Sequence, residues 1–232
     1  MFERIIVIND TIATLFSGLS KSKVDGYIGL IVSTGTNMAT FFDSKNIPKI
    51  AKISNWEGSI PVNLESGNFN PPHLTEFDKE LDIHSENPGV HRFEKVISGL
   101  YLGRIFKTIF PDSEFDPDSG ARGIVEIINK AEQMESNYIF AALKIYERSA
   151  KLVSASIAGL IALLSEYRRI EKIRIVAEGS LLWSEVNGKK HYFYLVQDTL
   201  LSLLENLKLS GLEVKISEID KATLTGTAIA AL

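Results

Sequence analysis

The chain has 232 residues, of which 45% are hydrophobic and 23% charged, so it can bury a sizeable core and does not have the composition of a disordered protein. Its formal net charge of −4 argues against a general nucleic-acid binder, which usually presents a basic face. Cysteine is absent, which excludes disulfides and thiolate metal sites and fits a cytoplasmic protein.

The N-terminal residues and the apolar runs do not predict a membrane segment. Residues 1–4 do not resemble the start of a signal peptide, and no small-residue cleavage site follows a suitable apolar run. The apolar run 152–164 contains Ser154 and Ser156 and is shorter than the roughly 20 residues that a membrane span needs. We therefore expect a buried helix there and no membrane span.

The first third of the chain is predicted to form strands around one helix. The expected strands are at 2–8, 26–33, 37–43 and 60–65. A helix is expected at 11–20, where apolar residues recur at helical spacing. The small residues 34–36 predict a hairpin turn between two of the strands, and the polar segment 44–58 is expected to be a loop.

From residue 73 onward the pattern is mostly helical. The expected helices are at 90–110, 121–134, 138–167, 190–208 and 221–232. Pro111 and Pro117 break the first two apart, and further strands are expected at 172–177 and 212–218. Strands followed by helices, and then strand–helix–strand–helix, predict one α/β domain with a mixed sheet and helices packed against it.

Asp10 is the first candidate for chemistry, because it follows an apolar run and opens a helical pattern next to Asn9. It could act as a general base beside a substrate hydroxyl. It could equally cap the helix, because an acidic residue there satisfies free backbone N–H groups and favours the helix dipole. The tripeptide alone leaves both interpretations open.

Three other groups of residues leave similar alternatives. The turn Thr34-Gly35-Thr36 could bring backbone N–H groups to phosphate oxygens, or could be a plain hairpin turn. Glu65 and Glu94 could accept hydroxyl hydrogens from a sugar, or could be solvated surface acids. The segments 178–180 and 223–227 could receive a nucleotide or be ordinary turns and caps.

The histidines and tryptophans of the sequence do not predict a metal site. The four histidines are His73, His84, His91 and His191, and their spacing is not that of metal ligands, so no protein metal site is expected. Trp56 and Trp183 are interpreted as packing residues.

Four segments in order, of which Asn9-Asp10-Thr11 is the first, resemble the eukaryotic-type hexokinase family, with the best match over 5–104. Residues 28–37 read IGLIVSTGTN and resemble the family's strand and Gly-Thr-Gly-x-Asn turn. Residues 62–69 read VNLESGNF and are similar to its Asn-x-Glu-Trp-Gly-x-Phe segment. The most specific stretch is 87–103, NPGVHRFEKVISGLYLG. Ser33 and Ser66 depart from the family pattern, where Gly and Trp are usual.

The resemblance implies an actin-like ATPase (ribonuclease H-like) fold and transfer of the ATP γ-phosphoryl group to the 6-hydroxyl of a hexose, with glucose as the first candidate. It implies that Asp10 is the general base and also binds sugar, with Mg²⁺ travelling on ATP. The other sugar-binding residues would be Asn9, Asn37, Glu65, Glu94 and His91. The residues around the nucleotide would be Thr34, Gly35, Gly99, Arg148, Gly179, Thr223 and Gly226.

The family also has a small lobe, with an Asp-x-Gly-Gly-Thr phosphate loop, that this sequence does not contain. We therefore expect residues 1–232 to correspond to the C-terminal large lobe and to phosphorylate glucose weakly or not at all in isolation. Apolar surface is expected where a small lobe would dock, and it could drive self-association.

Two other functions remain open at this point. The chain could be a non-catalytic module that binds a hexose or a nucleotide as a sensor or interaction partner. It could also be a relative with the same fold and another sugar substrate.

Overall fold

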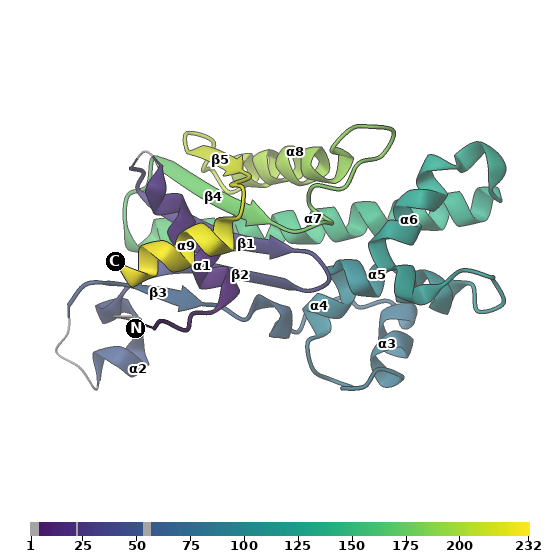
Figure 1. Ribbon diagram of the computed structural model, residues 1–232, viewed down its shortest axis with the longest axis horizontal. Helices are drawn as coiled ribbons and strands as arrows, with labels where there is room; N and C mark the ends of the chain where they lie inside the picture. The colour runs from purple at the N-terminus through teal and green to yellow at the C-terminus, as the bar shows by residue number, and fades with distance from the viewer. Residues whose placement is uncertain (1–4, 22, 53–56) are drawn as a thin grey trace.

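A mixed five-stranded sheet forms the centre of the computed structural model, which describes residues 5–21, 23–52 and 57–232 (Figure 1). Its strands are β1 (Gly26–Val32), β2 (Thr36–Asp43), β3 (Ser59–Asn63), β4 (Lys172–Glu178) and β5 (Glu213–Ser217). They lie in the order β3-β2-β1-β4-β5. The first three strands are antiparallel neighbours, whereas β4 runs parallel to both β1 and β5. The predicted mixed sheet is confirmed.

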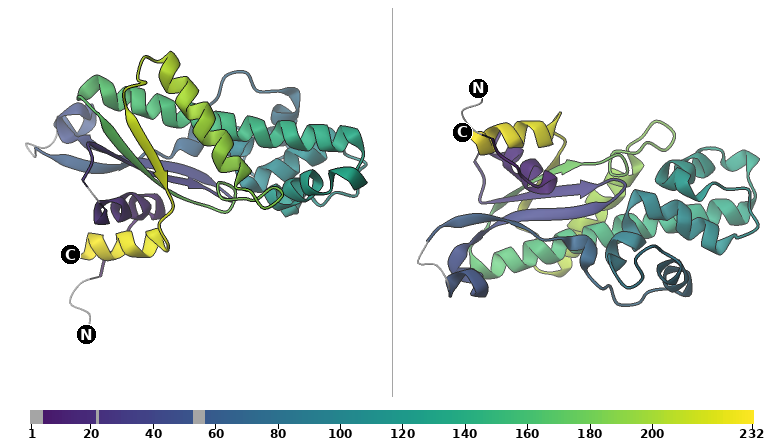
Figure 2. Two further views of the ribbon diagram at one scale, coloured as in Figure 1. Left: turned by 90° about the horizontal axis from the view of Figure 1, so that it is seen from above. Right: turned by 60° about the horizontal axis from the view of Figure 1, so that its bottom comes forward.

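Helices cover both faces of this sheet. The α-helices of the described residues, on the sheet and beyond it, are α1 (Asp10–Ser17), α2 (Pro48–Ala51), α3 (Glu76–Ile83), α4 (Arg92–Ile97), α5 (Gly99–Ile109), α6 (Gly120–Asn129), α7 (Ser136–Tyr167), α8 (His191–Asn206) and α9 (Ala222–Ala231). Helices α1 and α9 lie together on one face, and α7 and α8 lie on the other (Figure 2). The helices α3 to α6 gather around the far end of α7, beyond the sheet (Figure 1).

The core explains why β1 has almost no polar side chains. Ile28, Leu30 and Val32 are buried in the same cluster as Ile157 and Ile161 of α7. Because helices cover both sides of the sheet, a central strand can be apolar along its whole length instead of alternating.

Helix α7 is the only described helix long and apolar enough to cross a membrane, judged by length and composition alone. Half of its most apolar window is buried inside the protein. The buried apolar side chains along it belong to the main hydrophobic cluster. Its apolar character therefore has an explanation in the packing of α7 as the central core helix.

Most predicted elements are present, with three differences. The strand expected at 2–8 is wrong for residues 5–8, which form no strand and leave Val7 96% exposed; residues 2–4 lie outside the described part. The loop expected at 44–58 contains α2, which Pro48 begins, while Trp56 is not among the described residues. The helix expected at 90–110 is divided at Ser98, whose ψ of 154° is extended.

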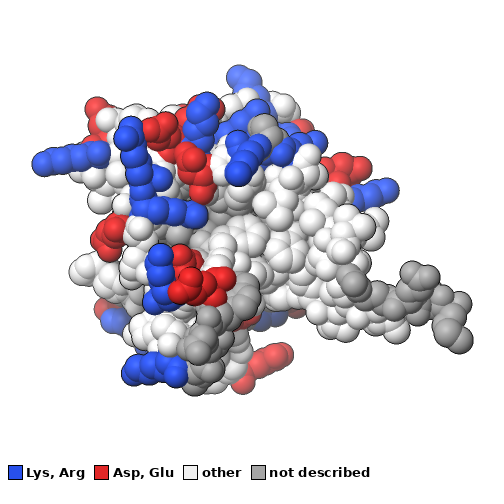
Figure 3. All heavy atoms as spheres, turned by 90° about the vertical axis from the view of Figure 1, so that its left-hand side faces the viewer, with Lys and Arg blue, Asp and Glu red and all other residues white. Residues whose placement is uncertain are grey.

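Charged side chains are mixed on the end of the molecule that Figure 3 shows. Blue and red groups are interspersed over the top and left of this face, and its centre and right are largely uncharged. Within the described part of this face, no continuous basic surface is present of the kind that general nucleic-acid binding uses.

Candidate functional site

A cleft of about 920 Å³ opens where the β1–β2 turn, the carboxyl end of β4 and the start of α1 meet. Open α/β sheets commonly bind ligands outside the carboxyl ends of their strands. Nine of the thirteen residues predicted to bind sugar or nucleotide line this cleft. They are Asn9, Asp10, Thr34, Gly35, Asn37, Glu65, Glu94, Gly179 and Thr223.

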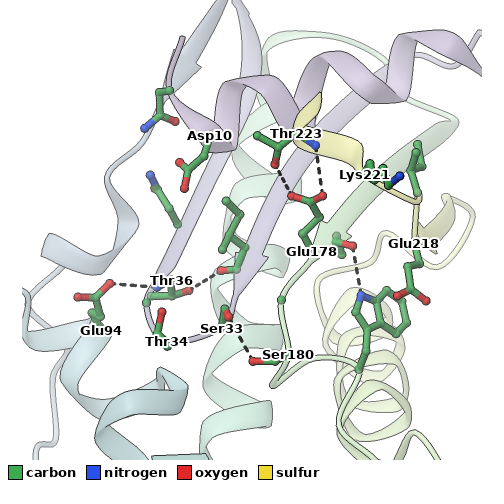
Figure 4. Close-up of a pocket in the computed structure, with 18 of the residues that line it drawn as sticks. Asp10, Ser33, Thr34, Thr36, Glu94, Glu178, Ser180, Glu218, Lys221 and Thr223 are labelled. Carbon is green, nitrogen blue, oxygen red and sulfur yellow. Dashed lines mark hydrogen bonds between the residues drawn. The ribbon is translucent and has the colours of Figure 1, made fainter. Parts of the chain in front are cut away.

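Asn9 and Asp10 lie together at the start of α1 and make different contacts. Asn9 is the N-cap of α1: its Oδ1 accepts from the backbone N–H of Thr11 at 2.9 Å and of Ile12 at 3.2 Å. Asp10 is the first helical residue, and its Oδ1 accepts from the backbone N–H and the hydroxyl of Thr11. Asn9 therefore performs the capping, and Asp10 faces the turn residues Thr34 and Thr36 across the cleft (Figure 4).

A chain of amide and carboxylate groups holds the next two predicted residues. Asn37 donates from Nδ2 to Asn63 Oδ1 at 2.8 Å, and Asn63 donates in turn to Glu65 Oε1. Asn37 Oδ1 accepts from the backbone N–H of Met38 and of Ser66. Glu65 has a left-handed φ of 48° just beyond β3, which turns it away from the strand direction. Asn63 was missed as a site residue, although it lies inside the quoted motif.

Glu94 is fixed by the hairpin turn from the other side of the cleft. It lies in the first turn of α4, where a carboxylate is favoured by the helix dipole, and its Oε2 accepts from Thr36 N–H at 3.0 Å. A Cβ added to Gly35 would lie 2.7 Å from the same oxygen. The absence of a side chain at Gly35 therefore lets the turn and the carboxylate approach each other.

Glu178 lies in the segment 178–180 that the sequence singled out, but a role for its carboxylate was not predicted. It accepts from the Thr14 hydroxyl at 3.0 Å. It also accepts from the backbone N–H of Thr223 at 3.2 Å and from the Thr223 hydroxyl (Figure 4). These bonds join α1, β4 and α9 at one edge of the cleft. A signal was available, because Glu178 is the first acidic residue after the buried run of β4 and so stands at a carboxyl strand end.

Two of the four remaining predicted residues lie close to the cleft but do not line it. His91 has a left-handed φ of 53° and precedes α4, three residues before Glu94. Gly99 donates its N–H to Ser33 O at 2.6 Å, and an added Cβ would lie 2.7 Å from that oxygen. Gly99 thus lets the start of α5 pack against the turn that carries Thr34 and Gly35.

Arg148 is placed away from the cleft, contrary to the predicted nucleotide contact. Its two terminal nitrogens donate to the two oxygens of Asp78, both at 2.8 Å, and Asp78 is only 3% exposed. Burial raises the pKa of Asp78, but hydrogen bonds from Arg148 and Thr75 outweigh that effect and hold the pKa below its ordinary value. The guanidinium is committed to an ion pair between α7 and α3.

Gly226 also serves packing and does not line the cleft. A Cβ at this position would lie 1.6 Å from the carbonyl oxygen of Ala13, so α9 can cross α1 this closely only with glycine here. Gly226, which was predicted to lie around the nucleotide, allows a helix crossing that positions Thr223, one turn earlier, against Glu178.

The sequence was also compared with known families and proteins. The family model described as hexokinase matches residues 27–143, which is about half of the chain. The chain belongs to the hexokinase family. Hexokinase-2 of Solanum tuberosum is 40% identical over 111 residues, and Hexokinase-2 of Oryza sativa subsp. japonica is 43% identical over 105 residues. Both alignments cover 44% of this chain, which spans 21% of the length of each of these hexokinases.

Solved structures with the same fold extend the likeness over nearly the whole chain. A hexokinase from Schistosoma mansoni complexed with glucose superposes with a TM-score of 0.72 and 24% identity, over 97% of this chain and 56% of its own. A ROK family glucokinase from Streptomyces griseus in complex with glucose and AMPPNP gives 0.53 and 18%, over 97% and 67%. At these identities the likeness shows the fold, which is the actin-like ATPase fold of sugar kinases.

The cleft offers no dedicated metal cage. No three His, Cys, Asp or Glu side chains converge on one point in the described part of the chain. Mg²⁺ bound by ATP keeps several waters and needs only one or two carboxylates, so the carboxylates of this cleft fit a cation that arrives with the nucleotide.

Proposed function

We propose that this chain forms the large lobe of a hexokinase-type sugar kinase, which transfers the γ-phosphoryl group of ATP to the 6-hydroxyl of glucose or another hexose. The observation that carries the proposal is the meeting of Asn9, Asp10, Asn37, Glu65 and Glu94 in one cleft from four separate chain segments. Family membership and the fold shared with sugar kinases support it.

In this proposal Asp10 is the general base. Its Oδ1 is engaged by Thr11, and no hydrogen bond to Oδ2 is recorded among the described residues. That second oxygen can accept the proton of the sugar 6-hydroxyl as the phosphoryl group arrives. Because the transition state of phosphoryl transfer is loose, the protein mainly positions the hydroxyl and neutralises charge.

The other polar groups orient the sugar. Asn9 uses its Oδ1 for the helix cap, which leaves its Nδ2 to donate to a hydroxyl. Glu65 and Glu94 each use one oxygen within the protein, which leaves the other to accept from sugar hydroxyls. Asn37 contributes mainly through the chain of bonds that orients Glu65.

The phosphates are proposed to lie beside Thr34 and Gly35, with Thr223 and Gly179 on the nucleotide side of the cleft. Small residues at the turn let backbone N–H groups approach phosphate oxygens. When bound, Mg²⁺ carried by ATP supplies the positive charge that neutralises the phosphate oxygens.

The binding of two sugars to two proteins, compared in all four combinations, tests the role of Asp10 without requiring turnover. Calorimetry measures the binding of glucose and of 6-deoxyglucose to the wild-type chain and to Asp10→Asn. Loss of a hydrogen bond to a charged group weakens binding about tenfold. We expect that loss for glucose, with 6-deoxyglucose unaffected, and no change for either sugar in the exposed control Asp118→Asn.

Equal losses for both sugars would argue that Asp10 does not touch the 6-hydroxyl. Absence of glucose binding would refute the proposal for this chain. ADP release with glucose and MgATP is measured in parallel and is expected to be weak. If it is detected, Asp10→Asn should lower it about 100-fold or more. Binding of both ligands with no transfer, even beside a small lobe supplied from a relative, would favour the non-catalytic module.

A further inference from the structure

A second cavity of about 670 Å³ lies between α7, the segment 69–75 and the start of α4. None of the functions proposed above uses it. Its walls are mainly apolar, and Phe69 packs edge-on against Phe93 at 5.9 Å between ring centroids. The other apolar walls include Pro71, Pro72, Leu74 and Leu152.

The floor of this cavity is one face of α7, where Leu152 is followed by three small residues. Leu152, Ala155, Ser156 and Gly159 are spaced i, i+3, i+4 and i+7, so they share one face of the helix. A Cβ added at Gly159 would meet no atom within 4 Å. Most of the long helix is packed against other elements, and here it borders open space that a side chain could occupy without a clash.

The polar end of the cavity is the ion pair between Arg148 and Asp78. The charges cancel, so the end is formally neutral. Asp78 engages two of the five guanidinium N–H groups, and Nε is buried without a hydrogen-bond partner among the described residues. The Arg148 side chain is still 29% exposed, so its terminal nitrogens can donate hydrogen bonds to a molecule bound in the cavity. Such an end suits a neutral acceptor better than an anion or a cation.

The second cavity and the main cleft share one wall. Asn37, Glu65 and Glu94 line the main cleft, and their direct chain neighbours line the second cavity. These neighbours are Met38, Ser66 and Phe93. The N–H groups of Met38 and Ser66 both donate to Asn37 Oδ1. A molecule that moved this wall would therefore move groups of the main cleft.

We propose that the second cavity is a regulatory site for an uncharged, mostly apolar small molecule with one hydrogen-bond acceptor. The apolar part lies against α7 and Phe69, and the acceptor receives a hydrogen bond from Arg148. Occupancy changes the main cleft through the shared wall. Only this last step rests on the proposed sugar kinase function.

Fluorine NMR with two matched probes tests the site directly. 4-(Trifluoromethyl)acetophenone has one acceptor, and 1-ethyl-4-(trifluoromethyl)benzene replaces its carbonyl by a methylene. For a molecule of this size we expect a Kd on the order of 1 mM for the ketone. Because it loses one hydrogen bond, the methylene probe should bind at least about threefold more weakly than the ketone.

The leucine side chain of the variant Gly159→Leu should fill the cavity and weaken binding of the ketone at least about tenfold. Because the added side chain meets open space and leucine favours a helix, this variant is expected to fold normally. Glu166→Leu adds the same side chain at an exposed position of α7 that does not line the cavity, and should bind like the wild type. Equal ketone binding by the wild type and Gly159→Leu would overturn the proposed site. So would the absence of ketone binding to the wild type at 5 mM, which is about five times the expected Kd.

The coupling is measured first without sugar. The ketone should shift the backbone amide signals of Asn37 and Glu65, which line the main cleft and not the cavity, in the wild type and not in Gly159→Leu. Unmoved signals would overturn the regulatory role. The Kd for glucose should then change at least about threefold when the ketone is saturating, a coupling within the usual range. Failure of glucose to bind, with the ketone bound and both signals shifted, would count against the proposed kinase function and leave the binding site standing.

Discussion

Removing the carboxylate of Asp82 should destabilise the fold more than removing its partner Lys95. Lys95 is 2% exposed and donates from Nζ to Asp82 Oδ1 at 2.6 Å and to the carbonyl oxygen of Asn87 at 2.7 Å. Asp82 is 9% exposed and also accepts from Gly89 N–H and from Arg92. The network closes the loop between α3 and α4, directly before Glu94.

The two single variants differ in what they leave behind. Asp82→Asn leaves a buried ammonium without a counter-charge, which costs about 3–5 kcal/mol of unfolding free energy. Lys95→Met leaves a carboxylate that keeps Gly89 N–H and Arg92, so the loss should be nearer 1–3 kcal/mol. The double variant should be at least about 1 kcal/mol more stable than Asp82→Asn, because no unpaired ammonium remains.

Urea unfolding, followed by circular dichroism, measures these differences. Burial raises the pKa of Asp82, but hydrogen bonds from Lys95 and Gly89 outweigh it, so the net pKa lies below its ordinary value. A depressed folded-state pKa stabilises the protein above the unfolded-state pKa near 3.9, and this contribution is lost as pH falls through the folded-state pKa. The difference between wild type and Asp82→Asn should therefore be constant between about pH 5 and 7 and shrink below about pH 4.

A loss smaller than about 1 kcal/mol for Asp82→Asn at pH 7 would refute this reasoning. A double variant whose loss is the sum of the two single losses would refute it as well.

The remaining predictions concern three glycines, of which Gly226 and Gly35 lie at close contacts and Gly159 lies beside open space. Gly226→Ala should lower the unfolding free energy by about 1–3 kcal/mol or more, because its Cβ cannot fit beside the Ala13 carbonyl. Gly159→Ala should be neutral or stabilise by up to about 1 kcal/mol in the same urea assay, and equal effects of both would contradict the packing argument. Gly35→Ala should displace the Glu94 carboxylate and weaken glucose binding about tenfold by calorimetry, without lowering stability to the same degree.

The sheet and most of the cleft could be predicted because their signals are local. Apolar runs such as 28–32 mark central strands, and the polar residues that directly follow such strands are carried to one edge of the sheet. Asn37, Glu65 and Glu94 could be grouped before the structure was known because their motifs occur in the family's order. The capping alternative for Asp10 was partly right, since a cap exists but Asn9 provides it.

The roles of Arg148 and Gly226 depend on helix packing that local patterns do not report. Arg148 meets Asp78 across 70 positions, because α3 packs near α7. A partial signal was present: Thr75 and Asp78 form a capping box, a pattern that marks a helix start and indicates an engaged carboxylate. The strand predicted at 2–8, which includes Val7, was wrong because a local pattern was not matched by a tertiary partner. A β-branched run forms a strand only where a sheet edge is available to it.

The charge of the main cleft bears on how its two proposed ligands can share it. Its lining residues give a formal charge of −5, from six carboxylates and one lysine. They are Asp10, Glu65, Glu94, Glu178, Glu218, Asp220 and Lys221. An uncharged sugar meets no repulsion from this wall, and carboxylates are good acceptors for its hydroxyls. This net negative charge would repel a bare triphosphate, so we expect phosphates to occupy the space beside Thr34 and Gly35 together with a divalent cation.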